Sequence, residues 1–509
     1  MLNIYPVTKT ADYCSDYKVK INGIDASLNT ARVSAVPFNR RWPGHQRGLE
    51  QTELVNFLSC ETDESLTFEI TPPKPFEKVY IKPLSLGIDP EITADGKIVF
   101  TLDKPAHFTV EPYVRNNALH IFADPVKKYN INKDAENVIY YGQGEHDVGL
   151  IILKSNQTLF IDEGAVVYAR VIAEDSDNIK ILGRGILDNS RNKEEILYEC
   201  NLENNDSAVN NAVREHTIKL DYCTNIEIDG ITIRDSLLYN IKPSGCKKIH
   251  INNVKIIGCW RYNSDGIDMH NCENVLIENC FLRTFDDSIC VKGFDFYFTN
   301  DNENAEHDAI YRNGQVYDTF KNVVIRNCTI WTDWGKSLEI GAETKAKEIY
   351  DIVFEDCNII HVCFDALDCF NVDYADVHDV LYQNINVEYD DIIPKPCGQT
   401  NDAEVYVNTD SDYYPNIIAA VITFHKEYSG GGLKRGINRN LTFRNIHVFG
   451  RHAPKVHFRG YDDAHKIKDV VIENLYWNEE LVTELPDERF FKNDFTENIV
   501  ITASDFDKQ

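Results

Sequence analysis

Hydrophobic and polar residues alternate in short runs over roughly the first 125 residues. Segments such as "SLTFEITPP" (65–73), "KIVFTLDKP" (97–105) and "HFTVEPYV" (107–114) place apolar side chains at every second position and are broken by Pro or Asp. Alternation of this kind is typical of strands that bury one face. We therefore predict that residues 1–125 form an N-terminal accessory domain of antiparallel strands, a β-sandwich.

From about residue 126 the pattern changes to a repeat. An Asn or Asp is followed by alternating aliphatic residues, a second Asn or Asp, and another short apolar run, as in "NVLIENCFLRT" at Asn274 and "NVVIRNCTIWT" at Asn322. Most copies follow one another after 23 to 29 residues, and three steps of 47, 48 and 61 residues allow a skipped copy or a long insertion. The copies begin at Asn178, Asn225, Lys248, Asn274, Asn322, Asp351, Asp379, Asn440, Asp469 and Asn498.

A repeat of this length, built from strands, indicates a solenoid of stacked coils. We predict an all-β protein in which a right-handed parallel β-helix, residues 126–509, follows the β-sandwich. Equivalent residues of successive coils then stack about 4.8 Å apart. Cys280, Cys328 and Cys357 share one register, so we expect them to form a buried ladder.

The strands that follow the repeat motifs can also be aligned with one another. Five stretches of five residues, the first at 239–243 and the last at 365–369, align position by position. The third column of this alignment is uniformly aliphatic and is predicted to face the core: Ile241, Ile267, Ile289, Leu338 and Leu367. Its fourth column is mostly charged and is predicted to face outward: Lys242, Asp268, Cys290, Glu339 and Asp368. Its first column also needs an outward orientation, because charges are costly to bury: Tyr239, Asp265, Asp287, Lys336 and Asp365.

Three carboxylates of this alignment are the candidate catalytic residues. Asp265 and Asp287 occupy equivalent places on neighbouring coils, and Asp286 stands beside Asp287. Clustered carboxylates cannot all ionise at low cost, so one holds a proton while another stays charged. Such a set supplies a general acid and a general base. An isolated Asp is more often a turn cap, but three Asp residues on adjacent coils favour catalysis.

Charge and composition limit the classes of binding partner and the cellular compartment that we expect. Acidic residues number 81 and basic residues 52, and the net charge of −29 disfavours nucleic acids and anionic membranes. The 14 cysteines show no disulfide framework, and Met1 to Lys20 lacks the pattern of a secretory signal. We expect a cytoplasmic protein without metal or cofactor; secretion with a removed signal and a homo-oligomer stay open.

At the acidic residues the chain resembles glycoside hydrolase family 28, the polygalacturonases of the pectin-lyase-like group. Asn263-Ser264-Asp265 looks like the Asn-Thr-Asp motif of that family, and Asp286-Asp287 looks like its Asp-Asp motif. The resemblance covers roughly residues 140–390. It implies that Asp286 is the general acid, that Asp265 and Asp287 activate water, and that hydrolysis inverts the anomeric centre.

Two departures from that family bear on the substrate. The Gly-His-Gly segment falls on Gly335-Lys336-Ser337, and the Arg-x-Lys motif that grips the galacturonate carboxylate falls on Ala366-Leu367-Asp368. Because the Arg and Lys that bind the carboxylate are missing, a neutral sugar is favoured at the cleavage subsite. A sandwich before a β-helix also resembles glycoside hydrolase family 49, the dextranases. The predicted substrate-binding residues are Lys336, Glu339, Asp365, Asp368, Asp268, Trp334 and Tyr239.

Several aromatic residues and histidines are further candidates, each with an ordinary structural alternative. Trp260, Tyr262, Trp331 and Trp334 either stack on sugar or pack at strand edges. Trp42, in the segment 40–53, either stacks on sugar or lies in a plain loop between strands, and His425 and His361 either line the cleft or are structural. The segments 294–311 and 429–436 are interpreted as loops, and neither fits a calcium or phosphate motif. Two other functions stay open: a polysaccharide lyase or uronate epimerase, and a non-catalytic glycan-binding solenoid.

Overall fold

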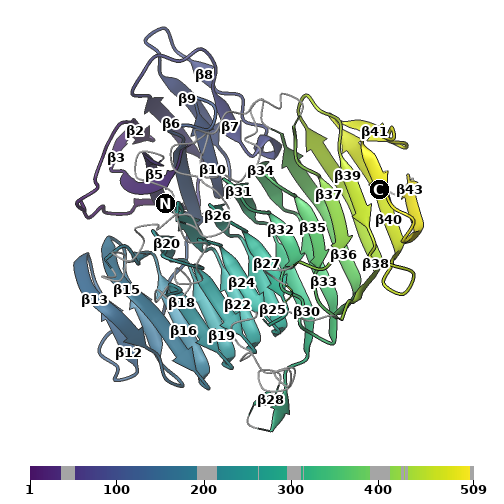
Figure 1. Ribbon diagram of the computed structural model, residues 1–509. Coiled ribbons are helices and arrows are strands. Elements are labelled where there is room, and N and C mark those ends of the chain that lie inside the picture. The colour runs from purple at the N-terminus through teal and green to yellow at the C-terminus, as the bar shows by residue number, and fades with distance from the viewer. Residues whose placement is uncertain are drawn as a thin grey trace, which may run out of the picture.

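The computed structural model describes residues 1–35, 52–191, 215–261, 263–294, 311–312, 314–389, 413–425, 429 and 434–504. The N-terminal part of the chain forms a small pair of sheets that packs against one side of a long stack of parallel strands (Figure 1). The stack continues to the C-terminus. In this part of the chain, none of the helical segments has the length and apolar character that crossing a membrane requires.

The N-terminal strands form two sheets that face each other. The first sheet contains β1 (Leu2–Ile4), β4 (Asn29–Ser34), β5 (Thr52–Thr62), β7 (Tyr80–Lys82), β10 (Ala106–Glu111) and β11 (Leu119–Pro125). The second contains β2 (Lys18–Ile21), β3 (Ile24–Ala26), β6 (Leu66–Thr71), β8 (Glu91–Ile92) and β9 (Ile98–Leu102), and the short 3-10 helix η2 spans Leu84–Leu86.

Apolar side chains fill the space between these two sheets, as the period-two pattern predicts. Phe68 stacks on Phe100, and Phe108 meets both rings edge-on at 5.8 Å. Pairing is antiparallel as predicted, except that β11 runs parallel to β5. The predicted sandwich is therefore present, with one parallel pair inside it.

Except for β28 (Tyr311–Arg312) and β29 (Gln315–Val316), the remaining described strands form a single 30-stranded arrangement in which each coil pairs with the next, which confirms the predicted parallel β-helix. One ladder carries the repeat motif: β12 (Val138–Tyr141), β14 (Thr158–Ile161), β16 (Asp177–Gly183), β19 (Thr224–Asp229), β22 (Lys247–Asn252), β25 (Glu273–Glu278), β30 (Thr319–Arg326), β33 (Glu348–Glu355), β36 (Asp376–Glu388), β38 (Ile437–Phe449), β40 (Ile467–Trp477) and β43 (Thr496–Thr502).

Two more ladders complete the coils. One contains β13 (Gly144–Ile152), β15 (Ala165–Glu174), β17 (Ile186–Asp188), β20 (Thr232–Arg234), β23 (Lys255–Ile257), β26 (Phe281–Thr284), β31 (Thr329–Thr332) and β34 (Asn358–His361). The other branches from β15 through β18 (Ile218–Asp221), β21 (Ile241–Ser244), β24 (Ile267–His270), β27 (Ile289–Lys292), β32 (Leu338–Gly341), β35 (Leu367–Asn371), β37 (Ile418–Ile422), β39 (Val456–Arg459) and β42 (Phe490–Lys492). Strands β28 and β29 form a separate two-stranded hairpin, and β41 (Glu480–Val482) pairs antiparallel with β40 of the first ladder.

The long steps of the repeat are insertions rather than skipped copies. Strand β16 pairs directly with β19, β25 with β30, and β36 with β38, so no coil is missing at any of the three steps. The predicted cysteine ladder is also present, because Cys280, Cys328 and Cys357 are buried and have free thiols. The described cysteines form no disulfide.

Candidate active site

The register of β24, β27, β32 and β35 brings the predicted columns together. Ile267 pairs with Ile289, Ile289 with Leu338, and Leu338 with Leu367, and all four side chains belong to the core of the β-helix. The fourth column therefore points to the opposite, outer side of these strands, as predicted. Its members are nevertheless almost completely covered, with exposed fractions of 0 to 3%.

The three candidate catalytic aspartates converge. Asp265, Asp286 and Asp287 each place a carboxylate oxygen within 4.8 Å of the other two. Asp265 and Asp286 are buried, with exposed fractions of 2% and 5%, while the side chain of Asp287 is 19% exposed. All three line one cavity of about 560 Å³, so they are covered by neighbours yet reach a space that a ligand can enter.

Local backbone contacts hold this acidic turn. The side-chain amide of Asn240 donates to the carbonyl oxygen of Asp265 at 2.7 Å, and the Thr284 hydroxyl donates to that of Asp286 at 2.7 Å. A Cβ atom at Gly335 would lie 2.3 Å from the carbonyl carbon of Asp286, so this turn accepts only glycine. Gly335 lets the next coil approach the Asp pair closely.

Two buried lysines are interleaved with the carboxylates. The ammonium of Lys292 lies 2.6 Å from Asp268, 3.6 Å from Asp265 and 3.9 Å from Asp287. The ammonium of Lys336 lies 2.5 Å from Asp368 and 2.6 Å from Glu339. Each lysine is thus surrounded by acids, as buried charges require.

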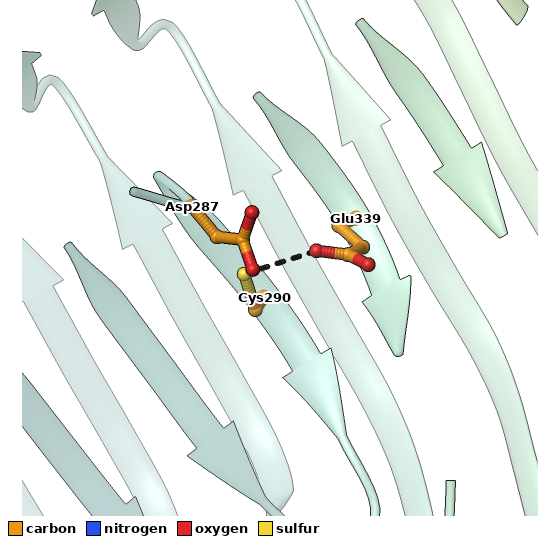
Figure 2. A group of neighbouring side chains, drawn as sticks. All are labelled: Asp287, Cys290 and Glu339. Atoms are coloured by element: carbon orange, nitrogen blue, oxygen red, sulfur yellow. Dashed lines mark hydrogen bonds between the residues drawn. The ribbon is translucent and has the colours of Figure 1, made fainter. Parts of the chain in front are cut away.

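A second acidic group borders the first. The side chains of Asp287, Cys290 and Glu339 gather between β27 and β32 (Figure 2), with ligand atoms within 4.8 Å of one another. The Cys290 thiol donates to Glu339 at 3.7 Å. Both this group and the three aspartates have a spacing that a cation can bridge. Lys292 supplies positive charge beside Asp265 and Asp287.

Burial and mutual repulsion favour protonated acids here. Burial raises the pKa of Asp286 well above its usual range, and the neighbouring charge of Asp287 raises it further. The pKa of Asp265 is raised well above its usual range by the same cause, with Asp268 and Asp286 adding to it. Burial also raises the pKa of Glu339 well above its usual range and that of Asp368 to about 7.

Most of the predicted substrate-binding residues line the cavity. Tyr239, Trp334, Lys336, Glu339, Asp365 and Asp368 do so. Asp268 does not, because it lies beneath Lys292 with no exposed surface. Trp334 stacks on Phe285 with nearly parallel rings 5.6 Å apart, which holds its indole at the cavity wall.

Three other aromatic candidates do not line this cavity, and for two of them the structural alternative holds. Trp331 is buried between the guanidinium of Arg283 and the ring of His361, so it meets no ligand. His361 is also buried and pairs with Glu111 of the N-terminal sheets at 2.8 Å. Trp260 lines a separate cavity, where Arg261 covers its ring.

His425, a candidate from the sequence, does line the cavity, but several other lining residues were not predicted. Those with polar or aromatic side chains are Lys292, Glu343, Phe364, Phe370, Asn416 and His457. Phe364 is 42% exposed, and its position just before Asp365 in the aligned stretch is the signal that identifies it. Trp42, Tyr262, residues 295–310 and residues 430–433 lie outside the described residues.

The fold and this site together define a class of protein, namely all-β proteins in which a parallel β-helix carries clustered aspartates in a cavity. The model of the Glycosyl hydrolases family 28 matches residues 146–396, and this segment of the chain belongs to that family. The predicted family resemblance is thereby confirmed. The N-terminal sheets lie outside the matched segment.

Curated relatives match shorter stretches. A "Probable polygalacturonase" from Vitis vinifera is 30% identical over 146 residues, which is 28% of this chain and 26% of that protein. A "Polygalacturonase" from Gossypium barbadense is 35% identical over 117 residues, which is 23% of this chain and 27% of that protein. The chain thus spans about a quarter of the length of these relatives.

A solved structure extends the likeness of fold to nearly the whole chain. Dex49A from Penicillium minioluteum superposes with a TM-score of 0.58 at 13% identity, covering 98% of this chain and 100% of that one. The match includes the N-terminal sheets as well as the β-helix. At this identity it shows a shared fold alone.

Proposed function

We propose that this protein is an inverting glycoside hydrolase that cleaves an α-linked oligo- or polysaccharide with a neutral sugar at the cleavage subsite. The observation that carries the proposal is the convergence of Asp265, Asp286 and Asp287 within 4.8 Å at the wall of a 560 Å³ cavity. Membership of residues 146–396 in the Glycosyl hydrolases family 28 supports the reaction class.

Asp286 is proposed as the general acid. A general acid must hold its proton at working pH, and burial together with the charge of Asp287 raises the pKa of Asp286. Its Oδ2 atom has no hydrogen-bond partner among the described residues, which leaves that oxygen able to meet a glycosidic oxygen. Protonation of that oxygen allows the leaving sugar to depart as an alcohol.

Asp265 and Asp287 are proposed to activate the attacking water. Two oxygens up to 4.8 Å apart can be bridged by a single water at ordinary O–H···O distances of about 2.7 Å. Lys292 lies 3.6 Å and 3.9 Å from these two carboxylates, and its charge opposes the rise that burial causes in the pKa of Asp265. A carboxylate pair of this kind can take a proton as the water attacks the anomeric carbon.

Inversion rests on the family resemblance rather than on carboxyl spacing. Inverting enzymes commonly hold their two carboxyl groups about 6.5–9.5 Å apart, and retaining enzymes about 5–5.5 Å apart. The oxygens here lie closer than the first window. The third carboxylate distinguishes this site from a simple pair, because it can bind water beside the acid.

A neutral sugar is proposed because the cavity is acidic. Its described lining contains seven carboxyl groups and two lysines: Asp265, Asp286, Asp287, Glu339, Glu343, Asp365, Asp368, Lys292 and Lys336. Both lysines already contact carboxylates within 2.6 Å. A uronate would add another negative charge beside these acids, whereas sugar hydroxyls can donate hydrogen bonds to them.

The same contacts disfavour a lyase or epimerase. Such an enzyme needs a base that can lose its proton near neutral pH. Lys336, which lines the cavity, is one available base, but the charges of Asp368 and Glu339 outweigh burial and raise its pKa well above the usual range. A lysine held as a cation by two carboxylates is a poor proton acceptor.

A substrate screen tests this proposal. The protein is incubated with α-linked neutral glycans and with polygalacturonate, and reducing ends are measured beside the absorbance of unsaturated products. We expect reducing ends from a neutral glycan, at least about 10-fold faster than from polygalacturonate. Faster cleavage of polygalacturonate would refute the neutral subsite, and unsaturated products would refute hydrolysis.

A further inference from the structure

Lys292 occupies the centre of the acidic cluster and is absent from the aligned columns that predict the site. It is the last residue of β27, and its side chain is 4% exposed. Its ammonium contacts Asp268 at 2.6 Å and stands 3.6 Å from Asp265 and 3.9 Å from Asp287. One cation therefore lies within 4 Å of both carboxylates that the proposed function assigns to water.

We propose that Lys292 is the positioning residue that holds Asp265 and Asp287 together for the activation of water, with Asp268 as its anchor. This inference rests on the proposed function for the role of those two aspartates. Asp268 makes the shortest contact but has no exposed surface and does not line the cavity. Its place beneath the ammonium fixes Lys292 without competing for substrate.

The surroundings of Lys292 explain why a cation is needed there. Titratable or charged side chains from several coils lie around it. The preceding coils contribute Tyr239, Lys242, Asp265, Asp268 and His270, and its own coil contributes Asp286, Asp287 and Cys290. The next coil contributes Lys336, Glu339 and Glu343. Six of these groups are carboxyls. Lys336 contacts Glu339 and Asp368 within 2.6 Å, so its charge is largely committed to them.

Burial and neighbouring acids keep the pKa of Asp265 well above its usual range, and Lys292 limits that rise. Burial alone would lower the pKa of Lys292, but the charges of Asp268 and of its other neighbours raise it well above the usual range. Lys292 in turn opposes the rise in the pKa of Asp265 and of Asp286. Removing the ammonium leaves burial and mutual repulsion unopposed, so protonated carboxyls persist to higher pH.

Three variants separate this role from simple structural support. Lys292→Met removes the charge, and the double variant Asp268→Asn/Lys292→Met also removes the carboxylate left without its partner. Lys255→Met is the matched control, because Lys255 is equally buried in the β-helix and its ion pair, 2.9 Å long, joins Asp124 away from the cavity. All three are compared with the wild-type full chain.

The first readout is the pH profile of kcat/KM on the best glycan of the screen. We expect Lys292→Met to lower kcat/KM by about 100-fold and to move the acid limb upward by about one pH unit. The double variant should regain thermal stability but keep the displaced limb, and Lys255→Met should keep the wild-type limb. A wild-type limb in Lys292→Met or in the double variant would overturn the inference.

The second readout needs no substrate. The difference in Tm between wild type and Lys292→Met is measured from about pH 4 to about pH 8, where carboxyls ionise. We expect the difference to widen as pH rises, because charged aspartates then lack their counter-ion. A constant difference would overturn the inference about Lys292. Failure of the wild-type protein to cleave any glycan would instead count against the proposed function.

Discussion

Asp286 and Asp287 are adjacent in the chain but have different surroundings. Asp286 is buried and its Oδ2 has no partner among the described residues, whereas Oδ1 of Asp287 accepts the backbone N–H of Lys336 at 2.8 Å. Backbone N–H donors are contacts that a charged carboxylate makes. Neighbouring acids can therefore be assigned opposite tasks, because one turn places them in different environments.

The assignment of Asp286 predicts the outcome of one substitution. Asp286→Asn should lower kcat/KM by about 10³- to 10⁴-fold, because the amide cannot donate an acidic proton at the same place. Initial rates on the cleaved glycan measure the loss, and circular dichroism with a melting curve checks that the fold persists.

Asp351→Asn is the control for that experiment. Asp351 has a left-handed φ of 54° at a repeat position where other coils carry Asn, so this change should be nearly silent. Activity of Asp286→Asn within tenfold of wild type would show that the acid is another group.

The sequence predicted the aspartates and missed Lys292 for a physical reason. The aligned stretches fix which side of a strand each residue faces, so Asp265 and Asp287 fall at one place on successive coils. Lys292 lies one residue past the end of its stretch, and its partners belong to the preceding coil. A lysine at a strand end is ordinarily exposed, and only the three-dimensional contacts show that it is buried.

The asparagines of the repeat are explained at the scale of the strand. Residues that begin or divide the motif adopt left-handed φ angles near 55°, as at Asn225, Asn274 and Asn322. Asn tolerates this conformation better than other side chains that carry a Cβ. Their amides also pair from coil to coil, as Asn322 does with Asn274 at 3.0 Å, which forms a ladder along the outside of the helix.

This ladder predicts the effect of a change at Asn327. Asn327 has a φ of 51° and donates to Asn279 at 2.6 Å. Asn327→Ala should lower the free energy of unfolding by about 1–2 kcal/mol, because alanine loses the contact and strains the backbone. Asn327→Gly keeps the conformation and should lose less. Chemical denaturation measures both; a larger loss in the glycine variant would contradict the left-handed requirement.

At the scale of the whole molecule, the N-terminal sheets cover one flank of the β-helix. Phe122 of β11 packs on Phe281 of β26 with ring centres 5.1 Å apart. Arg115 donates to Asp333 at 3.0 Å, one residue before the cavity-lining Trp334. Repeat periodicity cannot reveal such a cover, so the sequence left open whether Trp331 and His361 reach the cleft, and both are buried beneath the sheets.

This contact between the sheets and the helix should respond to pH. Glu388 of β36 is buried 3.5 Å from Lys82 of β7, and burial raises its pKa to about 7 despite that lysine. The folded state thus keeps a proton that the unfolded chain loses above about pH 4.5, so stability falls as pH rises from about 4.5 to about 7.

Glu388→Gln should flatten this dependence. The wild-type free energy of unfolding should fall by up to about 3 kcal/mol more than that of the variant across this range, because glutamine does not titrate. Denaturant titrations at stepped pH measure the two slopes. Equal slopes would mean that Glu388 does not carry the proton.

The stereochemistry of the first product tests the central claim most directly. Proton NMR of the fresh reaction mixture distinguishes the anomers before they interconvert. If Asp265 and Asp287 direct water to the anomeric carbon while Asp286 protonates the leaving oxygen, an α-linked glycan must release the β-anomer first. Initial release of the α-anomer would show that an aspartate attacks the sugar directly, and would contradict the proposed use of the three carboxylates.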